Sequence, residues 1–276
     1  MEYVKSPLNY TGGKYKLLPQ LLELFPKQVN TFVDLFAGGG DVSVNVKAEK
    51  VVFNDLMWQV PEMLQEFKKI GVEESLRKID GYISSYDLSK ENKEGYLALR
   101  ELYNKGKSDP LMLYTLICYS FNNQIRFNNK GAYNMPFGKD RSSFNPTLKE
   151  KFIIFVQRLQ SMEIQFSSKD FRELDLDTLG DNDFVYCDPP YTHSQSIIYG
   201  AQDFEIEALW KKIDECKNRG AKVILSINGM KNSQKTDISI TPPEGLFERK
   251  LLVNCGTSMI DRLQNNGKEM KNKNVD

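Results

Sequence analysis

The sequence has a single histidine, His193, and this scarcity excludes several kinds of site. A metal centre built from several histidines cannot form, and a catalytic triad would have to use that one side chain. The four cysteines include no C-x-x-C pair and no spacing typical of zinc ligands, so reduced and unreactive thiols are expected. We therefore predict no bound metal.

An excess of charge is also lacking, because 37 basic residues balance 37 acidic residues. Such a chain does not coat a polyanion with its whole surface, so any contact with nucleic acid must come from a local patch. Long apolar runs are missing too: residues 110–121 are too few to span a bilayer, and the amino terminus lacks the apolar core of a signal peptide. We expect a cytoplasmic protein that does not contact membranes.

The chain does contain enough apolar sequence for a sizeable core, at 40% of 276 residues. After an amphipathic segment at 14–25, a short β-type run at 31–36 leads into three glycines at 38–40. A second apolar run, 51–53, stops at Asn54 and Asp55. Strand, glycine turn, short helix and second strand ending in an acid are typical of a nucleotide-binding α/β unit.

The second half of the chain repeats this pattern. Residues 183–187 are predicted as a buried strand, and 222–227 as another. Between them, Asp203 can cap a helix whose apolar side chains run from Ile206 to Cys216 and which Gly220 closes. Strands that alternate with helices indicate an α/β fold with a mostly parallel sheet, in which ligands bind beyond the carboxyl ends of the strands.

Residues 57–144 have a different sequence pattern from the segments on either side of them. Helical stretches at 96–103 and after Asp109-Pro110 are followed by a polar run with a turn at 129–131, which predicts a β-hairpin. We expect an inserted helical module that carries a projecting hairpin. The tail at 265–276 is polar enough to be predicted as disordered.

The tetrapeptide Asp188-Pro189-Pro190-Tyr191 is the strongest local signal of chemistry. Its two prolines fix the backbone and remove two donors, so the carboxylate and the aromatic ring stand close together on a rigid turn. Asp188 and the Pro189 carbonyl can accept hydrogen bonds from an exocyclic amine, and Tyr191 can stack on its base. A strand followed by a purely structural proline turn is the alternative.

The glycine turn is a weaker signal. Gly38 and Gly40 begin a G-x-G-x-x-G pattern, but Ser43 stands where the third glycine would be, so a pyrophosphate is not indicated. Asp55, at the end of the next strand, is placed to accept hydrogen bonds from ribose hydroxyls, although an Asx turn explains it equally well. A cofactor with a ribose but no phosphate would fit both features.

Four motifs occur in order along the chain and together carry a family resemblance. They are Ser6-Pro7-Leu8-Asn9-Tyr10-Thr11-Gly12-Gly13-Lys14, Phe36-Ala37-Gly38-Gly39-Gly40, Asn54-Asp55 and Asp188-Pro189-Pro190-Tyr191. This order resembles the Dam family of DNA adenine-N6 methyltransferases, class α enzymes that use S-adenosylmethionine (SAM). The resemblance implies a Rossmann-like SAM-dependent methyltransferase fold, with residues 1–56 and 145–264 as the SAM-binding catalytic domain and 57–144 as the target-recognition domain.

The same resemblance implies roles for individual residues around the cofactor. Tyr10 and Lys14 would contact SAM, Asp55 would hold its ribose, and Asp188 would lie between its methionine part and the target base. The glycine turn passes under the cofactor, and an acid-aromatic pair contacts its adenine. These two groups comprise Asp34, Phe36, Gly38 and Gly40 in the turn, and Asp170 with Phe171 in the pair, where core packing is the alternative for Phe171.

Residues 121–128 and 131–139 are similar to the DNA-reading segment and hairpin of the family. By that match Arg126 reads a guanine, whose O6 and N7 suit the fork of a guanidinium. Well-known members have Tyr-Asn-Gly where this chain has residues 121–123, and an aromatic residue at position 140, so the recognition sequence, GATC or another, stays open. The implied DNA-binding residues are Asn122, Arg126, Asn128, Pro136, Lys139 and Arg141, within a stretch, 126–151, of six basic and two acidic residues.

Two side chains near the tetrapeptide, His193 and Cys187, are of reactive types but are not expected to take part in catalysis. His193 is not needed as a general base, because the methylated ammonium product is acidic enough to lose its proton to water. Cys187 does not have the Pro-Cys context of C5-cytosine methyltransferases, and we expect it to pack at a strand end.

The sequence therefore predicts transfer of the SAM methyl group to N6 of a flipped adenine in double-stranded DNA. Methylation of RNA adenine or of cytosine N4, and a catalytically silent DNA-binding regulator, remain open alternatives. A cognate restriction endonuclease is a conceivable partner, and the sequence leaves the oligomeric state undetermined.

Overall fold

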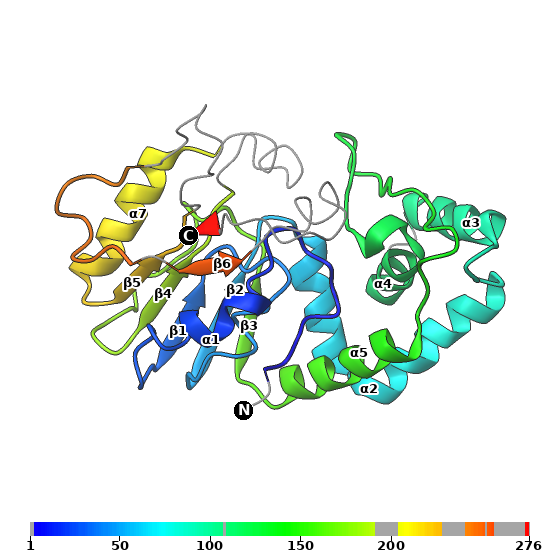
Figure 1. Ribbon diagram of the computed structural model, residues 1–276, viewed down its shortest axis with the longest axis horizontal. Coiled ribbons are helices and arrows are strands. Elements are labelled where there is room, and N and C mark those ends of the chain that lie inside the picture. Colours follow the sequence, from blue (N-terminus) through cyan, green and yellow to red (C-terminus); the bar gives the residue numbers. More distant parts are fainter. Residues whose placement is uncertain are drawn as a thin grey trace.

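The computed structural model of the protein describes residues 3–106, 109–190, 204–227, 241–251, 253–256 and 274–275. Its centre is a sheet of five parallel strands in the order β3-β2-β1-β4-β5 (Figure 1). The strands are β1 (Thr31–Asp34), β2 (Lys50–Asn54), β3 (Ile164–Ser167), β4 (Phe184–Cys187) and β5 (Lys222–Leu225). The expectation of an α/β fold with a parallel sheet is confirmed, and β3 is an edge strand that the pattern did not predict.

The central strand β1 pairs with β2 on one side and β4 on the other. Its last residue, Asp34, lies opposite Phe53 of β2 and Tyr186 of β4. All three strands run in the same direction, so the residues that follow them meet at one edge of the sheet.

Helix α7 (Ile206–Asn218) covers one face of the sheet. It buries Leu209, Ile213 and Cys216 in the same apolar cluster as Val33 of β1. The predicted helix is confirmed, but it begins after Glu205, which provides no side-chain cap, while Asp203 lies outside the described residues.

The amino-terminal segment is less helical than its amphipathic pattern predicts. It forms only a 3-10 turn, η1 (Tyr15–Leu17), and one turn of helix, α1 (Leu18–Leu21). Leu18, Leu21 and Phe25 are nevertheless buried, and the Phe25 ring meets that of Phe184 edge to face at 4.6 Å.

The prediction of a short helix after the glycine turn is wrong, because no regular helix forms there. Residues 41–46 form successive turns, in which Val44 donates to the carbonyl of Gly40 and Val46 to that of Val42. Val42, Val44 and Val46 are buried, so core packing holds the segment in shape although it is too short to propagate a helix.

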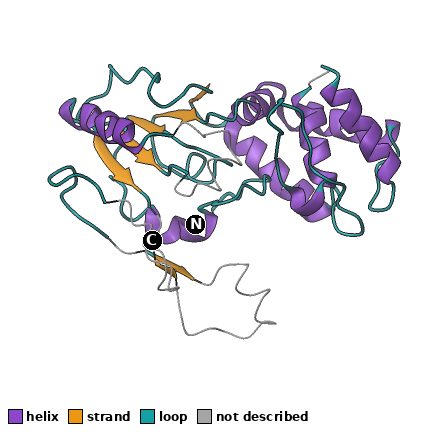
Figure 2. Cartoon of the chain, turned by 90° about the horizontal axis from the view of Figure 1, so that it is seen from above, coloured by secondary structure: helices purple, strands orange, loops and turns teal. Residues whose placement is uncertain are grey.

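Four helices form a second group beside the sheet (Figures 1 and 2). They are α2 (Gln59–Ser85), α3 (Lys93–Asn104), α4 (Pro110–Tyr119) and α5 (Pro146–Gln160). This confirms the helices predicted at 96–103 and after Asp109. The whole of α4 from Leu111 to Tyr119 is buried, which explains why its sequence is apolar on all sides.

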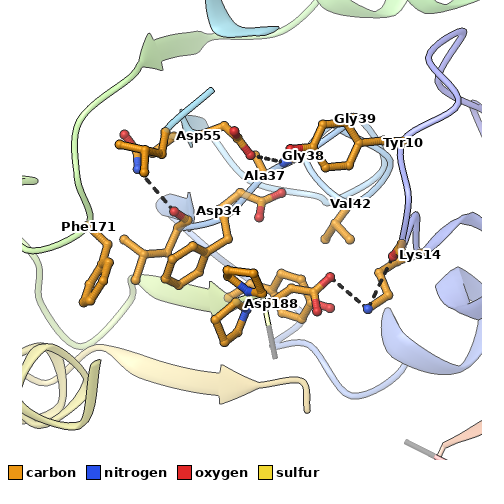
Figure 3. Close-up of a pocket in the computed structure, with 18 of the residues that line it drawn as sticks. Tyr10, Lys14, Asp34, Ala37, Gly38, Gly39, Val42, Asp55, Phe171 and Asp188 are labelled. Carbon is orange, nitrogen blue, oxygen red and sulfur yellow. Dashed lines mark hydrogen bonds and ion pairs between the residues drawn. The ribbon is translucent and has the colours of Figure 1, made fainter. Parts of the chain in front are cut away.

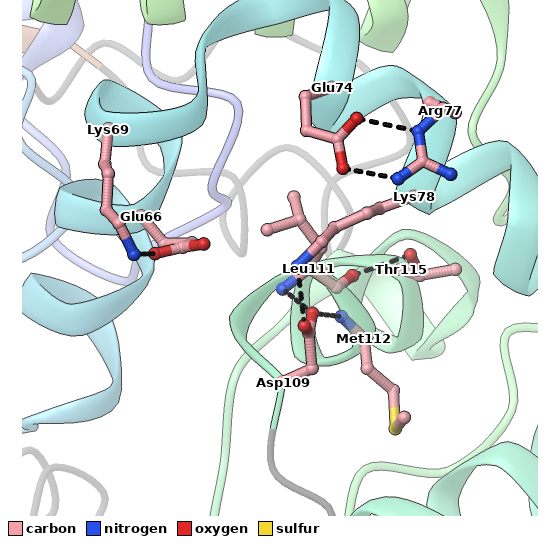
Figure 4. A network of polar contacts seen from close by, with 9 residues as sticks. All are labelled: Glu66, Lys69, Glu74, Arg77, Lys78, Asp109, Leu111, Met112 and Thr115. Atoms are coloured by element: carbon pink, nitrogen blue, oxygen red, sulfur yellow. Dashed lines mark hydrogen bonds and ion pairs between the residues drawn. The ribbon is translucent and has the colours of Figure 1, made fainter.

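Polar contacts fix the start of α4. The carboxylate of Asp109 accepts hydrogen bonds from the backbone N–H groups of Leu111 and Met112, and its other oxygen lies 2.9 Å from the ammonium of Lys78 on α2 (Figure 4). An N-terminal cap of this kind satisfies donors that the helix itself cannot. Asp109 therefore ties the buried helix to α2.

The predicted hairpin is confirmed between residues 121 and 138. Phe127 and Tyr133 form an antiparallel bridge, as do Ser120 and Phe137, with the 3-10 turn η2 (Phe121–Asn123) at its base. The Asn128 side chain accepts from the backbone N–H groups of residues 130 and 132 and so closes the tip.

Two short strands, β6 (Asn254–Gly256) and β7 (Asn274–Val275), pair antiparallel. Most of the tail predicted as disordered, 265–276, lies outside the described residues. Among the helices that the structure describes, none is both long and apolar enough to cross a membrane.

Helix α2 bends at Gly71, whose backbone angles (φ 74°, ψ −173°) are available almost only to glycine. A Cβ there would also lie 2.7 Å from Nε2 of Gln160 on α5. We predict that Gly71→Ala lowers the free energy of unfolding by about 2 to 3 kcal/mol. Urea denaturation measures this loss.

The matched control is Gly81→Ala in the same helix. Gly81 is exposed and a Cβ would meet nothing within 4 Å, so this change should stabilise the protein by about 0.5 to 1 kcal/mol. Equal effects of the two substitutions would contradict the assigned bend.

Candidate functional site

A cavity of about 350 Å³ opens beyond the carboxyl ends of β1, β2 and β4 (Figure 3). Most residues predicted to form the cofactor and catalytic site line it together. They are Tyr10, Lys14, Asp34, Phe36, Gly38, Asp55, Asp170, Phe171, Asp188, Pro189 and Pro190. Gly40 lies behind the turn, where an added Cβ would meet the ring of Phe53 at 3.2 Å.

Asp34 ends the central strand at the bottom of this cavity. Its Oδ2 accepts a hydrogen bond of 2.6 Å from the hydroxyl of Ser43, while its buried Oδ1 has no partner among the described residues. Burial, with smaller contributions from the charges of Asp188 and Asp55, raises the pKa of Asp34 to about 7. This carboxyl group therefore takes up a proton near neutral pH.

Asp55 holds the glycine turn to the end of β2. Its two oxygens accept from the backbone N–H groups of Gly38 and Met57, at 2.8 and 2.9 Å. The second bond makes the Asx turn that we weighed as an alternative, and the first keeps the turn closed. Burial raises the pKa of Asp55 to about 6, against the opposing effect of these bonds.

Asp188 follows β4 directly and faces Lys14. Its Oδ2 lies 2.8 Å from the ammonium nitrogen, and the two side chains are only 16% and 10% exposed (Figure 3). A largely buried carboxylate needs a partner of opposite charge, and Lys14 provides one from the far end of the sequence. The pair joins the first predicted motif to the last.

The segment before Lys14 is fastened to the glycine turn. The carboxylate of Asp41 accepts from the backbone N–H of Ser6 at 3.0 Å, and Asn45 exchanges two hydrogen bonds with the main chain of Val4. The Tyr10 ring lies so close to Gly38 that a Cβ there would come within 3.0 Å of it. These contacts place Tyr10 and Lys14 at the wall of the cavity.

The opposite wall is aromatic. Phe36 and Phe171 have ring centroids 5.4 Å apart, and Phe204 packs against both. Phe171 thus belongs to the core, as the alternative held, and also lines the cavity. Beside it, the Asp170 carboxylate is held by two hydrogen bonds from the guanidinium of Arg172, which lower its pKa.

The predicted DNA-binding residues of the hairpin are exposed. Tyr133 and Met135 point inward and are buried, whereas Arg126, Asn128 and Pro136 are exposed. Lys139 and Arg141, which follow the hairpin, are exposed as well.

Asn122 stands at the base of the hairpin, with a left-handed backbone (φ 56°). Its carbonyl accepts from the Asn9 side chain at 2.7 Å, which links the hairpin to the segment that carries Tyr10 and Lys14.

Three other residues were named from the sequence, and the structure describes only Cys187 among them. Tyr191 and His193 lie outside the described residues. Cys187 is fully buried at the end of β4, and burial raises its thiol pKa well above the ordinary value. The expectation that Cys187 packs rather than reacts is confirmed, because a thiolate is the reactive form.

The sequence indicated most of the residues that line the cavity, but not the residues that hydrogen-bond to them. Ser43 was noted only as a missing glycine, yet its hydroxyl satisfies Asp34. Asp41, Asn45 and Asn9 were not singled out, and only the polarity of positions near the motifs could have indicated them.

The sequence profile of the D12 class N6 adenine-specific DNA methyltransferases matches residues 10–251, which is most of the chain. The chain belongs to this family. The matched range includes the glycine turn, the hairpin and Asp188.

Among relatives, the type II methyltransferase M.FokI of Planomicrobium okeanokoites is 52% identical over 189 residues, which covers 68% of this chain and 29% of that protein. The modification methylase StsI of Streptococcus sanguinis is 46% identical over 190 residues, again 29% of its length. The DNA adenine methylase of Haemophilus influenzae is 26% identical over 199 residues, 68% of this chain and 64% of that one. The chain thus spans less than a third of the two most similar of these three.

The buried Asp34 gives a prediction for stability against pH. Its folded pKa of about 7 exceeds its ordinary value of 3.8, so the native state holds a proton that the unfolded chain releases. The stability that this proton contributes is fully present below about pH 3.8, declines as the pH rises, and is lost once the pH has passed about 7. Asp34→Asn cannot ionise. We predict that the free energy of unfolding of this variant, relative to wild type, increases by about 2 to 3 kcal/mol between about pH 5 and about pH 8.

Urea denaturation at both pH values measures this difference. The exposed Glu23→Gln serves as the control for the loss of a surface carboxylate. A difference for Asp34→Asn that stays constant with pH would show that Asp34 is ionised throughout.

Proposed function

We propose that this chain transfers the methyl group of S-adenosylmethionine to N6 of adenine in double-stranded DNA. The observation that carries the proposal is the position of Asp188, which lies at the end of β4, is paired with Lys14 and opens onto the cavity above the glycine turn. Membership of the D12 class supports the reaction type, and names such as DNA adenine methylase support it for relatives.

The cavity suits this cofactor in size and chemistry. About 350 Å³ falls within the range of small-molecule sites, and the aromatic wall of Phe36 and Phe171 offers a surface for a purine ring. Asp34, whose buried Oδ1 has no partner within the described part of the chain, and Asp55 lie where positively charged or hydroxyl groups would be bound. When bound, S-adenosylmethionine supplies an electrophilic methyl group on a positively charged sulfur.

We assign the following roles to the residues near the target amine. Asp188 and the carbonyl of Pro189 accept hydrogen bonds from the two N–H groups of adenine N6, which orients the nitrogen lone pair toward the methyl carbon. Lys14 keeps the Asp188 carboxylate in position, and Pro190 rigidifies the turn. Tyr191 stacks on the flipped base. The proton that N6 then loses passes to water.

DNA recognition is assigned to residues 57–144 as the target-recognition domain, with residues 1–56 and 145–264 as the catalytic domain. Arg126 reads a guanine, and Asn122, Asn128, Pro136, Lys139 and Arg141 contact the duplex around it, at a recognition sequence such as GATC. Relatives named as modification methylases make a cognate restriction endonuclease the partner to look for.

The test is the loss of methyl transfer in Asp188→Ala. Removal of one group that hydrogen-bonds in the transition state costs on the order of 10² to 10³ in rate, so kcat should fall by at least this factor at saturating cofactor. Transfer of labelled methyl groups to DNA from a host without adenine methylation measures it.

Glu207→Gln, an exposed carboxylate on α7, is the control and should retain wild-type activity. Activity of Asp188→Ala within tenfold of wild type would refute the assigned active site. Methyl transfer by the wild-type protein to RNA or to cytosine, but not to DNA adenine, would refute the assigned substrate.

A further inference from the structure

The guanidinium of Arg126 is held by Asn134, which lies across the hairpin. Its Nε donates to Oδ1 of Asn134 at 2.8 Å, and its Nη2 donates to the main-chain carbonyl of the same residue at 3.2 Å. The Asn134 N–H donates in turn to the carbonyl of Arg126. The two residues therefore face each other in the hairpin and are joined by both side-chain and backbone contacts.

These contacts decide which edge of the guanidinium can bind a further group. The group is flat and rigid, and its five N–H bonds form two usable edges, Nε with Nη2 and Nη1 with Nη2. Asn134 occupies the first edge, so the second is the edge with which Arg126 can offer two parallel donors to another group. Two parallel donors are what O6 and N7 of a guanine accept in the major groove.

Asn134 is itself on a rigid support. The residues on either side of it, Tyr133 and Met135, are buried. Asn104 exchanges two hydrogen bonds with the main chain of Tyr133, and the Met135 carbonyl accepts from the hydroxyl of Tyr96 and from Arg100, at 2.9 and 2.8 Å. The α3 helix thus fixes the backbone from which Asn134 reaches Arg126.

We propose that Asn134 is a positioning residue for base recognition, which presents the Nη1–Nη2 edge of Arg126 to a guanine. An arginine on an exposed hairpin otherwise has many side-chain conformations, and ordering them on binding reduces affinity and selectivity. The inference rests on the proposed function, in which Arg126 reads a base. It differs from a direct role of Asn134 at a phosphate, which would carry no sequence information.

The experiment compares wild type, Asn134→Ala, Arg126→Ala and the double variant on two sets of duplexes. One duplex carries the recognition site, identified by modification-sensitive sequencing of DNA methylated by the wild-type protein. The others carry 7-deazaguanine, which lacks the N7 acceptor, in place of each guanine of the site in turn. The readout is the ratio of kcat/KM between the normal and the substituted duplex.

Wild type should show a penalty of about tenfold at one guanine, and Arg126→Ala close to none. Asn134→Ala should reduce the wild-type penalty by at least about threefold, because only the main-chain contact to Arg126 remains. In the double variant the result should equal that of Arg126→Ala alone, since a residue that acts through another has no effect in its absence. Asn134→Asp keeps an acceptor for Nε and should retain the penalty.

Each other outcome identifies what has failed. If Arg126→Ala abolishes the penalty but Asn134→Ala does not reduce it, the role of Asn134 is wrong while base reading by Arg126 stands. If Asn134→Ala instead lowers kcat/KM by the same factor on the normal and on every substituted duplex, and does so also in the Arg126→Ala background, Asn134 makes a sequence-independent contact of its own and the inference is overturned. If Arg126→Ala keeps the penalty, base reading and the inference both fail, and absence of methyl transfer by wild type overturns the proposed function itself.

Discussion

Burial of three carboxyl groups at one edge of a parallel sheet is the constraint on which the site depends. Asp34 ends its strand and Asp55 and Asp188 directly follow theirs; these three adjacent strands run in the same direction, so the carboxyl groups cannot be separated without a change of topology. Each has a different compensation: protonation and Ser43 for Asp34, two backbone N–H groups for Asp55, and the Lys14 ammonium for Asp188. A positively charged cofactor would complete this balance.

The compensation of Asp188 depends on contacts far apart in sequence. Lys14 reaches Asp188 only because the segment before it is fastened to the glycine turn by Asp41 and Asn45. The same segment touches the base of the hairpin through Asn9, so the cavity wall and the hairpin share one stretch of chain. The cavity and the hairpin are thereby parts of one connected structure.

The parallel sheet and the acidic residues at its edge could be predicted from the sequence, because both depend on local patterns. Apolar runs predicted β1, β2, β4 and β5, and the acidic residues after two of these runs, Asp55 and Asp188, were predicted as site residues. The strand β3 alternates weakly at the sheet edge and was missed. Pairings such as Lys14 with Asp188, or Arg126 with Asn134, could not be predicted, because they depend on tertiary placement and on the register of the hairpin.

The most direct test of this account is identification of the methylated nucleoside. The purified protein is incubated with double-stranded DNA and S-adenosylmethionine that carries an isotopically labelled methyl group, and the DNA is digested and analysed by mass spectrometry. We predict that the label appears in N6-methyldeoxyadenosine. Label in N4-methyldeoxycytidine, or in no nucleoside, would contradict it.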